Sequence, residues 1–189
     1  MNQRTFLQTF VRNKLGMIGL FGVLLILLVG IIGPIFVPYP AGYAADTAHT
    51  YQVPSAEHWL GTDNLGLDVF AEIVWGARTS VYVSMVAVLC SACIGIPLGL
   101  ISGYFQGKVG AVIDTIIEIF MTLPMLPLMI VIAAVVGSSV TNVAVVIGIL
   151  SWPSLARVTR SSTMRTSEMQ FIEVSRSLGV SRTKTLFKH

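Results

Sequence analysis

Four long stretches of the chain consist almost entirely of apolar residues, and polar segments separate them. A helix needs about 20 such residues to cross the hydrocarbon core of a membrane. The predicted spans are residues 15–37, 79–104, 112–136 and 141–156. Because backbone groups in lipid must be hydrogen-bonded within their own segment, the pattern predicts an all-α membrane protein, a polytopic bundle of transmembrane helices.

The first span could be confused with a cleaved signal peptide, since it lies close to the N-terminus. The apolar core of a signal peptide is about 7–15 residues long. The uncharged run over 15–37 is longer, and no small-residue cleavage site follows it. We therefore interpret it as a retained transmembrane helix.

The polar segments differ in character. Residues 38–78 contain five acidic side chains and many Gly, Pro and Thr residues, which indicates an aqueous segment with irregular structure. Within it, residues 68–75 are expected to form a short helix lying at the membrane interface. Residues 105–111 form a short loop, residues 137–140 a turn, and residues 157–189 a polar, basic tail.

Composition and charge support this arrangement and orient it. Only 11% of the residues are charged, against about a quarter in a soluble domain. Eleven of the twelve Lys and Arg residues lie in the N-terminal segment 1–14, the loop 105–111 or the tail 157–189, and Arg78 is on the other side. The positive-inside rule makes the N-terminus and the tail cytoplasmic, and segment 38–78 extracytoplasmic.

Helix breakers and small residues occur inside the spans. Pro97 lies in the second span, and Pro124 and Pro127 lie in the middle of the third. Gly95 and Gly99 are four residues apart, a spacing that permits close helix approach. A dimer contact and packing within the chain both fit that spacing.

Two acidic residues, Asp114 and Glu118, are the only charged residues within the spans. Acids inside a membrane are candidates for proton relays or cation sites, which would indicate a secondary transporter or a channel. Both, however, lie within about two turns of the start of the third span. We favour an interfacial position, or a salt bridge to Lys108 or to an arginine of the tail.

No catalytic or cofactor-binding pattern is present. The glycines before Lys108 resemble a phosphate loop, but three residues instead of four separate Gly103 from Gly107, and Val109 replaces the required Ser or Thr. We expect no metal site, no cofactor and no enzymatic activity in this chain, so any ATP would bind to another chain. The histidines are scattered and are interpreted as ordinary polar residues: His49, His58 and His189.

The tail contains an amphipathic stripe. Phe171, Val174 and Leu178 follow the i, i+3, i+7 spacing of one helix face, and Gly179 ends the helix. Such a basic amphipathic helix could lie on anionic lipid. The segment 173–179 also resembles the Glu-Ala-Ala-x-x-x-Gly motif of the cytoplasmic loop of ATP-binding-cassette (ABC) importer permeases.

The match consists of Glu173 and Gly179, while Val174 and Ser175 replace the two alanines. A second resemblance lies in segment 58–70. It is similar to Leu-Gly-Thr-Asp-x-x-Gly-Arg-Asp, a sequence motif found after the first span of dipeptide, oligopeptide and nickel permeases. The matching residues are Gly61, Thr62, Asp63, Gly66 and Asp68, and Leu67 stands where arginine is usual.

Together these segments resemble the C-type subunit of that permease family, from about Lys14 to the end of the chain. Segments 76–80 and 99–107 and the pair Trp152-Pro153 resemble it as well. The resemblance implies a bacterial-type plasma membrane protein with a permease core from about residue 79. It also implies six spans, of which four are present, so the chain resembles a C-terminally truncated permease.

The resemblance further implies a set of partners. These are a second permease subunit, two cytoplasmic ATPases and an extracytoplasmic substrate-binding protein, in addition to membrane lipid, with no nucleic acid. The tail would be the coupling helix that docks on an ATPase. Phe171, Val174 and Leu178 would enter a groove, and Glu173 and Arg176 would fix the register of the helix at the rim. Ser175 belongs to the same docking segment.

The function implied is ATP-driven import, and the substrate is expected to be a di- or oligopeptide, with nickel as the alternative. Two other readings of the chain stay open at this point. One is the secondary transporter or channel that uses Asp114 and Glu118. The other is a truncated permease fragment without transport activity.

Overall fold

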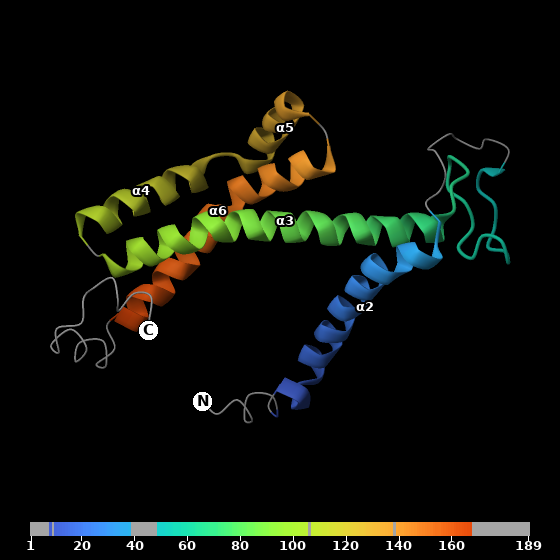
Figure 1. Cartoon of the computed structure of the whole chain (residues 1–189), viewed down its shortest axis with the longest axis horizontal. Helices are drawn as coiled ribbons and strands as arrows, with labels where there is room; N and C mark the ends of the chain where they lie inside the picture. Colours follow the sequence, from blue (N-terminus) through green and yellow to red (C-terminus); the bar gives the residue numbers. More distant parts are fainter. Residues whose placement is uncertain (1–7, 9, 39–48, 106, 138, 168–189) are drawn as a thin grey trace. The chain divides into compact units, whose positions relative to one another are not determined.

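The computed structural model describes the chain in five stretches: residues 8, 10–38, 49–105, 107–137 and 139–167 (Figure 1). It divides into two compact units, residues 1–82 and 83–189, and each is described here by itself. Within the described stretches, the one β feature is an isolated antiparallel bridge between Thr62 and Asp68.

Five named helices account for most of the described residues. They are α2 (Lys14–Phe36), α3 (Val69–Tyr104), α4 (Lys108–Thr122), α5 (Met125–Val136) and α6 (Val140–Ser167). Among them α2, α3 and α6 are long and apolar enough to cross a membrane, and the bent pair α4–α5 makes a fourth span if it is counted as one. The expected all-α polytopic membrane fold is confirmed.

Helix α2 is apolar on all sides, and Gly30 is its only buried residue. Its bounds differ by one residue from the predicted span 15–37. The Asn13 side chain accepts a hydrogen bond from the Gly16 N–H at 3.1 Å and so caps its first turn. Its other end is held by Trp75, whose indole N–H donates to the Val37 carbonyl at 3.2 Å.

Helix α3 begins ten residues before the predicted start at residue 79, and this corrects the sequence prediction. Residues 69–75 are helical, as expected for the short helix over 68–75, but they form the first turns of α3 and not a helix of their own. A helix of 36 residues is about 54 Å long, whereas the hydrocarbon core is about 30 Å thick. Hydropathy indicates where the chain leaves lipid, and a helix can continue beyond that point.

The third predicted span, 112–136, is not one straight helix. Helix α4 ends at Thr122, α5 begins at Met125, and the two are bent by 83°. Leu123 between them is extended, with φ −69° and ψ 138°. The residue before a proline is disfavoured in helical conformation, so Pro124 explains the break.

Helix α6 starts one residue before the predicted fourth span, 141–156, but ends eleven residues later, at Ser167. The first part of the basic tail is therefore a continuation of the same helix. The polar residues after residue 156 end the apolar stretch, but the helix continues through them.

In the second unit, α4 packs against α6 around a small apolar core. Ile117 and Ala156 are fully buried, and Trp152 is nearly so. The Phe120 and Trp152 rings meet at 5.3 Å between centroids in an edge-on arrangement. Ile94 of α3 packs against the same cluster, so the core joins three helices.

A stripe of small residues lets α3 lie directly against α6. A methyl group placed on three successive glycines of α3 would come 2.8, 2.6 and 2.7 Å from carbonyl oxygens of α6. The glycines are Gly95, Gly99 and Gly103, and the carbonyls belong to Trp152, Ala156 and Arg160. The Gly95/Gly99 spacing is therefore used for packing within the chain, one of the two interpretations of the sequence.

Candidate functional site

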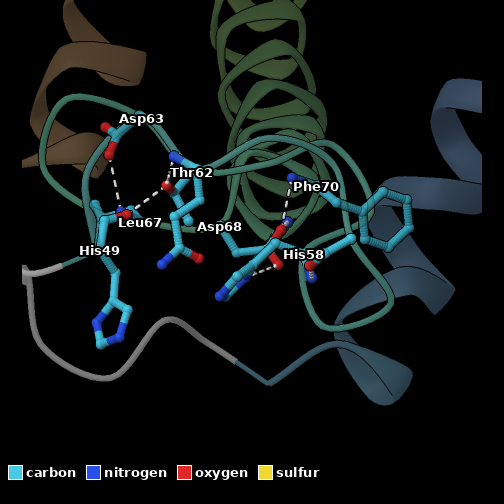
Figure 2. Close-up of polar contacts among 10 residues, drawn as sticks. His49, His58, Thr62, Asp63, Leu67, Asp68 and Phe70 are labelled. Atoms are coloured by element: carbon cyan, nitrogen blue, oxygen red, sulfur yellow. Dashed lines mark hydrogen bonds and ion pairs between the residues drawn. The ribbon is translucent and has the colours of Figure 1, made fainter.

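The five matching residues of segment 58–70 are called the outer motif here, and the loop of residues 49–68 that contains them is called the outer loop. Three of them, Thr62, Asp63 and Asp68, make hydrogen bonds in this loop, immediately before α3 (Figure 2). The other two are glycines with left-handed backbone, Gly61 at φ 76° and Gly66 at φ 80°. Gly61 also lies against another part of the loop, since a methyl group there would come within 2.3 Å of the Gln52 carbonyl oxygen. Both requirements explain glycine at position 61.

Thr62 joins the two sides of the loop. It is 7% exposed, and its hydroxyl accepts the Gln52 N–H at 2.8 Å and donates to the His49 carbonyl at 2.5 Å. The backbone adds a second link, because the Thr62 N–H donates to the Gln52 carbonyl at 3.1 Å. A hydroxyl is both a donor and an acceptor, which suits this position.

Asp63 closes the next turn. One carboxylate oxygen accepts two backbone N–H groups, those of Leu65 and Leu67, each at 2.8 Å. An aspartate that bonds the backbone two residues ahead stabilises a turn in this way. Leu67 is 7% exposed, so in this chain a buried apolar residue stands where arginine is usual.

Asp68 caps α3 and hydrogen-bonds to His58. One oxygen accepts the N–H groups of Phe70 and Ala71 at 2.8 and 3.1 Å, and the other lies 2.9 Å from His58 Nδ1. Burial raises the pKa of Asp68. The hydrogen bond from His58, the backbone donors and the charge of His58 lower the pKa by more, so the net direction is downward.

His58 was interpreted as an ordinary polar residue, and the structure adds a specific partner for it. It is the partner of Asp68, ten residues away in sequence. The available signal was its place at the start of segment 58–70, the stretch with the family resemblance. Thr62 and Asp63 hydrogen-bond within the loop, and Asp68 joins the loop to the first turn of α3, so these motif residues organise the start of α3.

A second polar cluster joins three helices in the other unit. Arg160 of α6 lies 3.2 Å from an Asp114 oxygen of α4, and its Nε donates to the Ser102 hydroxyl of α3 at 2.9 Å. That hydroxyl, almost fully buried, donates in turn to the Gly110 carbonyl at 3.4 Å. The salt bridge predicted between Asp114 and an arginine of the tail is present, and Glu118 is exposed.

The predicted ATPase-docking residues lie outside the described residues. They are Phe171, Glu173, Val174, Ser175, Arg176, Leu178 and Gly179. Among the residues that the structure does describe, no group of three or more His, Cys, Asp or Glu side chains is arranged to hold a metal ion.

Comparison with known proteins assigns the family. Residues 95–189 match the family described as binding-protein-dependent transport system inner membrane component. The chain belongs to this permease family. Residues 4–54 of the permease chain match a second family, the N-terminal transmembrane domain of oligopeptide transport permease C. The resemblance to C-type permeases is therefore confirmed.

Curated relatives of the permease chain come from several bacteria. It is 33% identical over 186 residues to the glutathione transport system permease protein GsiD of Pectobacterium atrosepticum, which covers 98% of this chain and 62% of the relative. It is 35% identical over 179 residues to the dipeptide transport system permease protein DppC of Alkalihalophilus pseudofirmus, covering 94% and 58%. The oligopeptide transport system permease protein OppC of Bacillus subtilis is 31% identical over 180 residues, covering 95% and 59%.

The permease chain thus spans roughly six tenths of the length of these relatives. The matches include both segments that carried the sequence resemblance. The outer loop lies within the aligned length, and the tail segment 171–179 lies within the family match that begins at residue 95.

Proposed function

We propose that this chain is a transmembrane subunit of an ATP-driven, binding-protein-dependent importer for di- or oligopeptides. The observation that carries the proposal is the family match over residues 95–189, which includes the core around α6 and the tail. The peptide substrate is supported by relatives named for glutathione, dipeptide and oligopeptide transport.

The chain itself would perform no covalent chemistry and would need no cofactor. ATP binding and hydrolysis would occur in two separate cytoplasmic ATPases, and a second permease subunit would complete the pathway. An extracytoplasmic binding protein would deliver the substrate. The N-terminus and the tail would face the cytoplasm of a bacterial inner membrane, as the distribution of Lys and Arg favours.

The tail segment 171–179 would dock on one ATPase. Helix α6 ends at Ser167, four residues before Phe171, so a movement of the docking segment would act directly on this helix. Helix α6 also contacts two other helices. It packs against the glycines of α3, and its Arg160 pairs with Asp114 of α4. Movement imposed by ATP binding would therefore reach the core as a displacement of α6, which would shift the pathway between inward-facing and outward-facing states.

Copurification tests the proposal. A tagged chain is expressed in its own bacterium, extracted in mild detergent and analysed by mass spectrometry for P-loop ATPases. We expect ATPases to copurify with the unaltered chain, and Gly179→Pro or Glu173→Ala to reduce their recovery. Glu168→Ala is the matched control, because it removes a nearby carboxylate outside the motif and should leave recovery unchanged.

Two results would contradict the proposal. One is the absence of any ATPase partner from membranes in which the chain is folded. The other is peptide uptake that collapses with a proton-gradient uncoupler and continues without ATP, which would favour a secondary transporter.

A further inference from the structure

An apolar groove of about 800 Å³ lies along the contact between α2 and the first turns of α3. Its walls include Val29 and Phe36 of α2 and Phe70 and Val74 of α3, and all of them lie within the unit of residues 1–82. The volume falls in the range of about 300–1,000 Å³ that is typical of small-molecule sites. The groove is therefore large enough to hold a ligand.

One wall of the groove is α2, which has the surface of a lipid-facing helix. Helix α2 exposes large apolar side chains along its whole length, from Leu15 to Phe36, and only Gly30 is buried. A helix that is apolar all round and long enough to span the bilayer is solvated by acyl chains. The natural occupant of an apolar groove open on such a helix is an acyl chain.

One end of the groove is acidic. Glu57 in the outer loop and Asp68 at the start of α3 both line it, and none of the described lining residues carries a positive charge. Asp68 is engaged by His58 and by the first turn of α3. Glu57 is exposed, so a cationic group can reach it.

Tryptophan side chains place this acidic end at the level of the lipid headgroups. Trp59, which lines the groove, is 67% exposed and packs against Phe70 with 5.1 Å between ring centroids. Trp75 donates its indole N–H to the Val37 carbonyl, where α2 ends. Tryptophan is enriched at membrane–water interfaces because one part of it is apolar and the other is polar.

We propose that this groove binds a phospholipid with a primary ammonium headgroup, of the phosphatidylethanolamine type. One acyl chain lies along α2, and the ammonium group meets Glu57. A primary ammonium has three N–H donors for a carboxylate, whereas a choline headgroup has no N–H to donate. An anionic headgroup would be repelled by Glu57 and Asp68. This assignment depends only on membrane insertion and is independent of the proposed import function.

Photolabelling tests the site. The full chain is inserted into phosphatidylcholine vesicles and exposed to photoreactive phosphatidylethanolamine or phosphatidylcholine that carry the same diazirine acyl chain. Labelled residues are mapped by mass spectrometry. We expect the ethanolamine lipid to label the groove about two- to fivefold more than the choline lipid, the ratio that an exposed ion pair supplies. Equal labelling by both lipids, or no labelling of the groove, would overturn the assignment.

Matched variants separate the headgroup from the acyl chain. Glu57→Gln should abolish the preference for ethanolamine, whereas Glu72→Gln, on the first turn of α3 outside the groove, should keep it. Val29→Phe fills the groove and should lower labelling by both lipids, and Val23→Phe on the open surface of α2 should not. If Val29→Phe fails to fold, the position 57 comparison decides, and a preference that survives Glu57→Gln contradicts the proposal.

Discussion

The outer loop before α3 and the contact between α3 and α6 both bring backbones close together, but they do so by opposite means. In the loop, polar side chains such as Thr62 and Asp63 reach across the chain to backbone groups. Between the helices, the absence of side chains at Gly95 and Gly99 allows the approach. The loop has no regular ladder and must recruit side-chain hydrogen bonds, whereas each helix already satisfies its own backbone.

The largest loss of stability is expected when a bulky side chain is introduced into the contact between α3 and α6. A methyl group at Gly99 would lie 2.6 Å from the Ala156 carbonyl oxygen and from Thr159 Cβ, so Gly99→Leu must separate α3 from α6. We expect a loss of about 3 kcal/mol in stability, or failure to fold. Thermal unfolding in detergent measures it. The control is Gly19→Leu on α2, where no atom lies within 4 Å; equal damage from both variants would contradict the packing account.

A substitution at one glycine of the outer loop, Gly61, tests whether that loop also depends on close backbone approach. Gly61→Ala meets the Gln52 carbonyl and also a positive φ, and should destabilise the loop by about 2 kcal/mol. Hydrogen exchange of residues 49–68 measures this locally. Gly76→Ala is the control, because that position is helical and open, and should be stabilising by about 0.5–1 kcal/mol.

Removing the cap of α3 should have a smaller effect. Asp68→Ala loses the bonds to Phe70 and Ala71 and the pair with His58, and should cost about 1 kcal/mol at the first turn of α3. Because the pKa of Asp68 is lowered in the folded loop, its contribution is complete above the ordinary carboxyl pKa of about 4 and is lost as the pH falls through the lowered value.

Asp68→Asn sharpens this test, since asparagine can still cap a helix but does not ionise in this range. Amide exchange at the first turn of α3, followed from neutral to acidic pH, should show a loss of protection in the unaltered chain and little change in the variant. A loss of the same size in both would show that another group controls the loop.

The smallest effect on stability is expected from the ion pair between Arg160 of α6 and Asp114 of α4. Arg160 and Asp114 are each about 30% exposed, so solvent screens their attraction. A double-mutant cycle with Arg160→Gln and Asp114→Asn should give a coupling of roughly 0.5 kcal/mol. A coupling several times larger would mean that charge, and not only close packing, holds α6 against α4.

The same contrast explains what could be predicted from the sequence. The span that became α2 was predicted to within one residue, because a uniformly apolar helix begins and ends where its hydropathy does. Helix α3 was misjudged at its start, since nothing in hydropathy indicates a helix that continues into the aqueous segment. Pro124 and Pro127 stand in the middle of the third predicted span, but the 83° bend between α4 and α5 depends on the extended backbone at Leu123.

For the candidate sites, the sequence identified residues, but the contacts between them required the folded structure. The outer motif residues were identified through their resemblance to a family, but their contacts connect positions up to thirteen residues apart and needed the folded loop. The contact between His58 and Asp68 was not predicted, because nothing in the sequence around a single histidine indicates which residue it will pair with. The Asp114 salt bridge was predicted with either a lysine or an arginine, and only the packing of α6 on α4 selects Arg160.

In the proposed orientation, the outer loop and the basic tail lie on opposite sides of the membrane, and thiol labelling in whole cells tests this most directly. In a chain with Cys90 and Cys93 changed to alanine, one cysteine is introduced at Ala56 or at Ser175. With a membrane-impermeant maleimide, Ala56→Cys should be labelled in intact cells and Ser175→Cys only after permeabilisation. Labelling of Ser175→Cys in intact cells would contradict the orientation, and with it the proposed docking on a cytoplasmic ATPase.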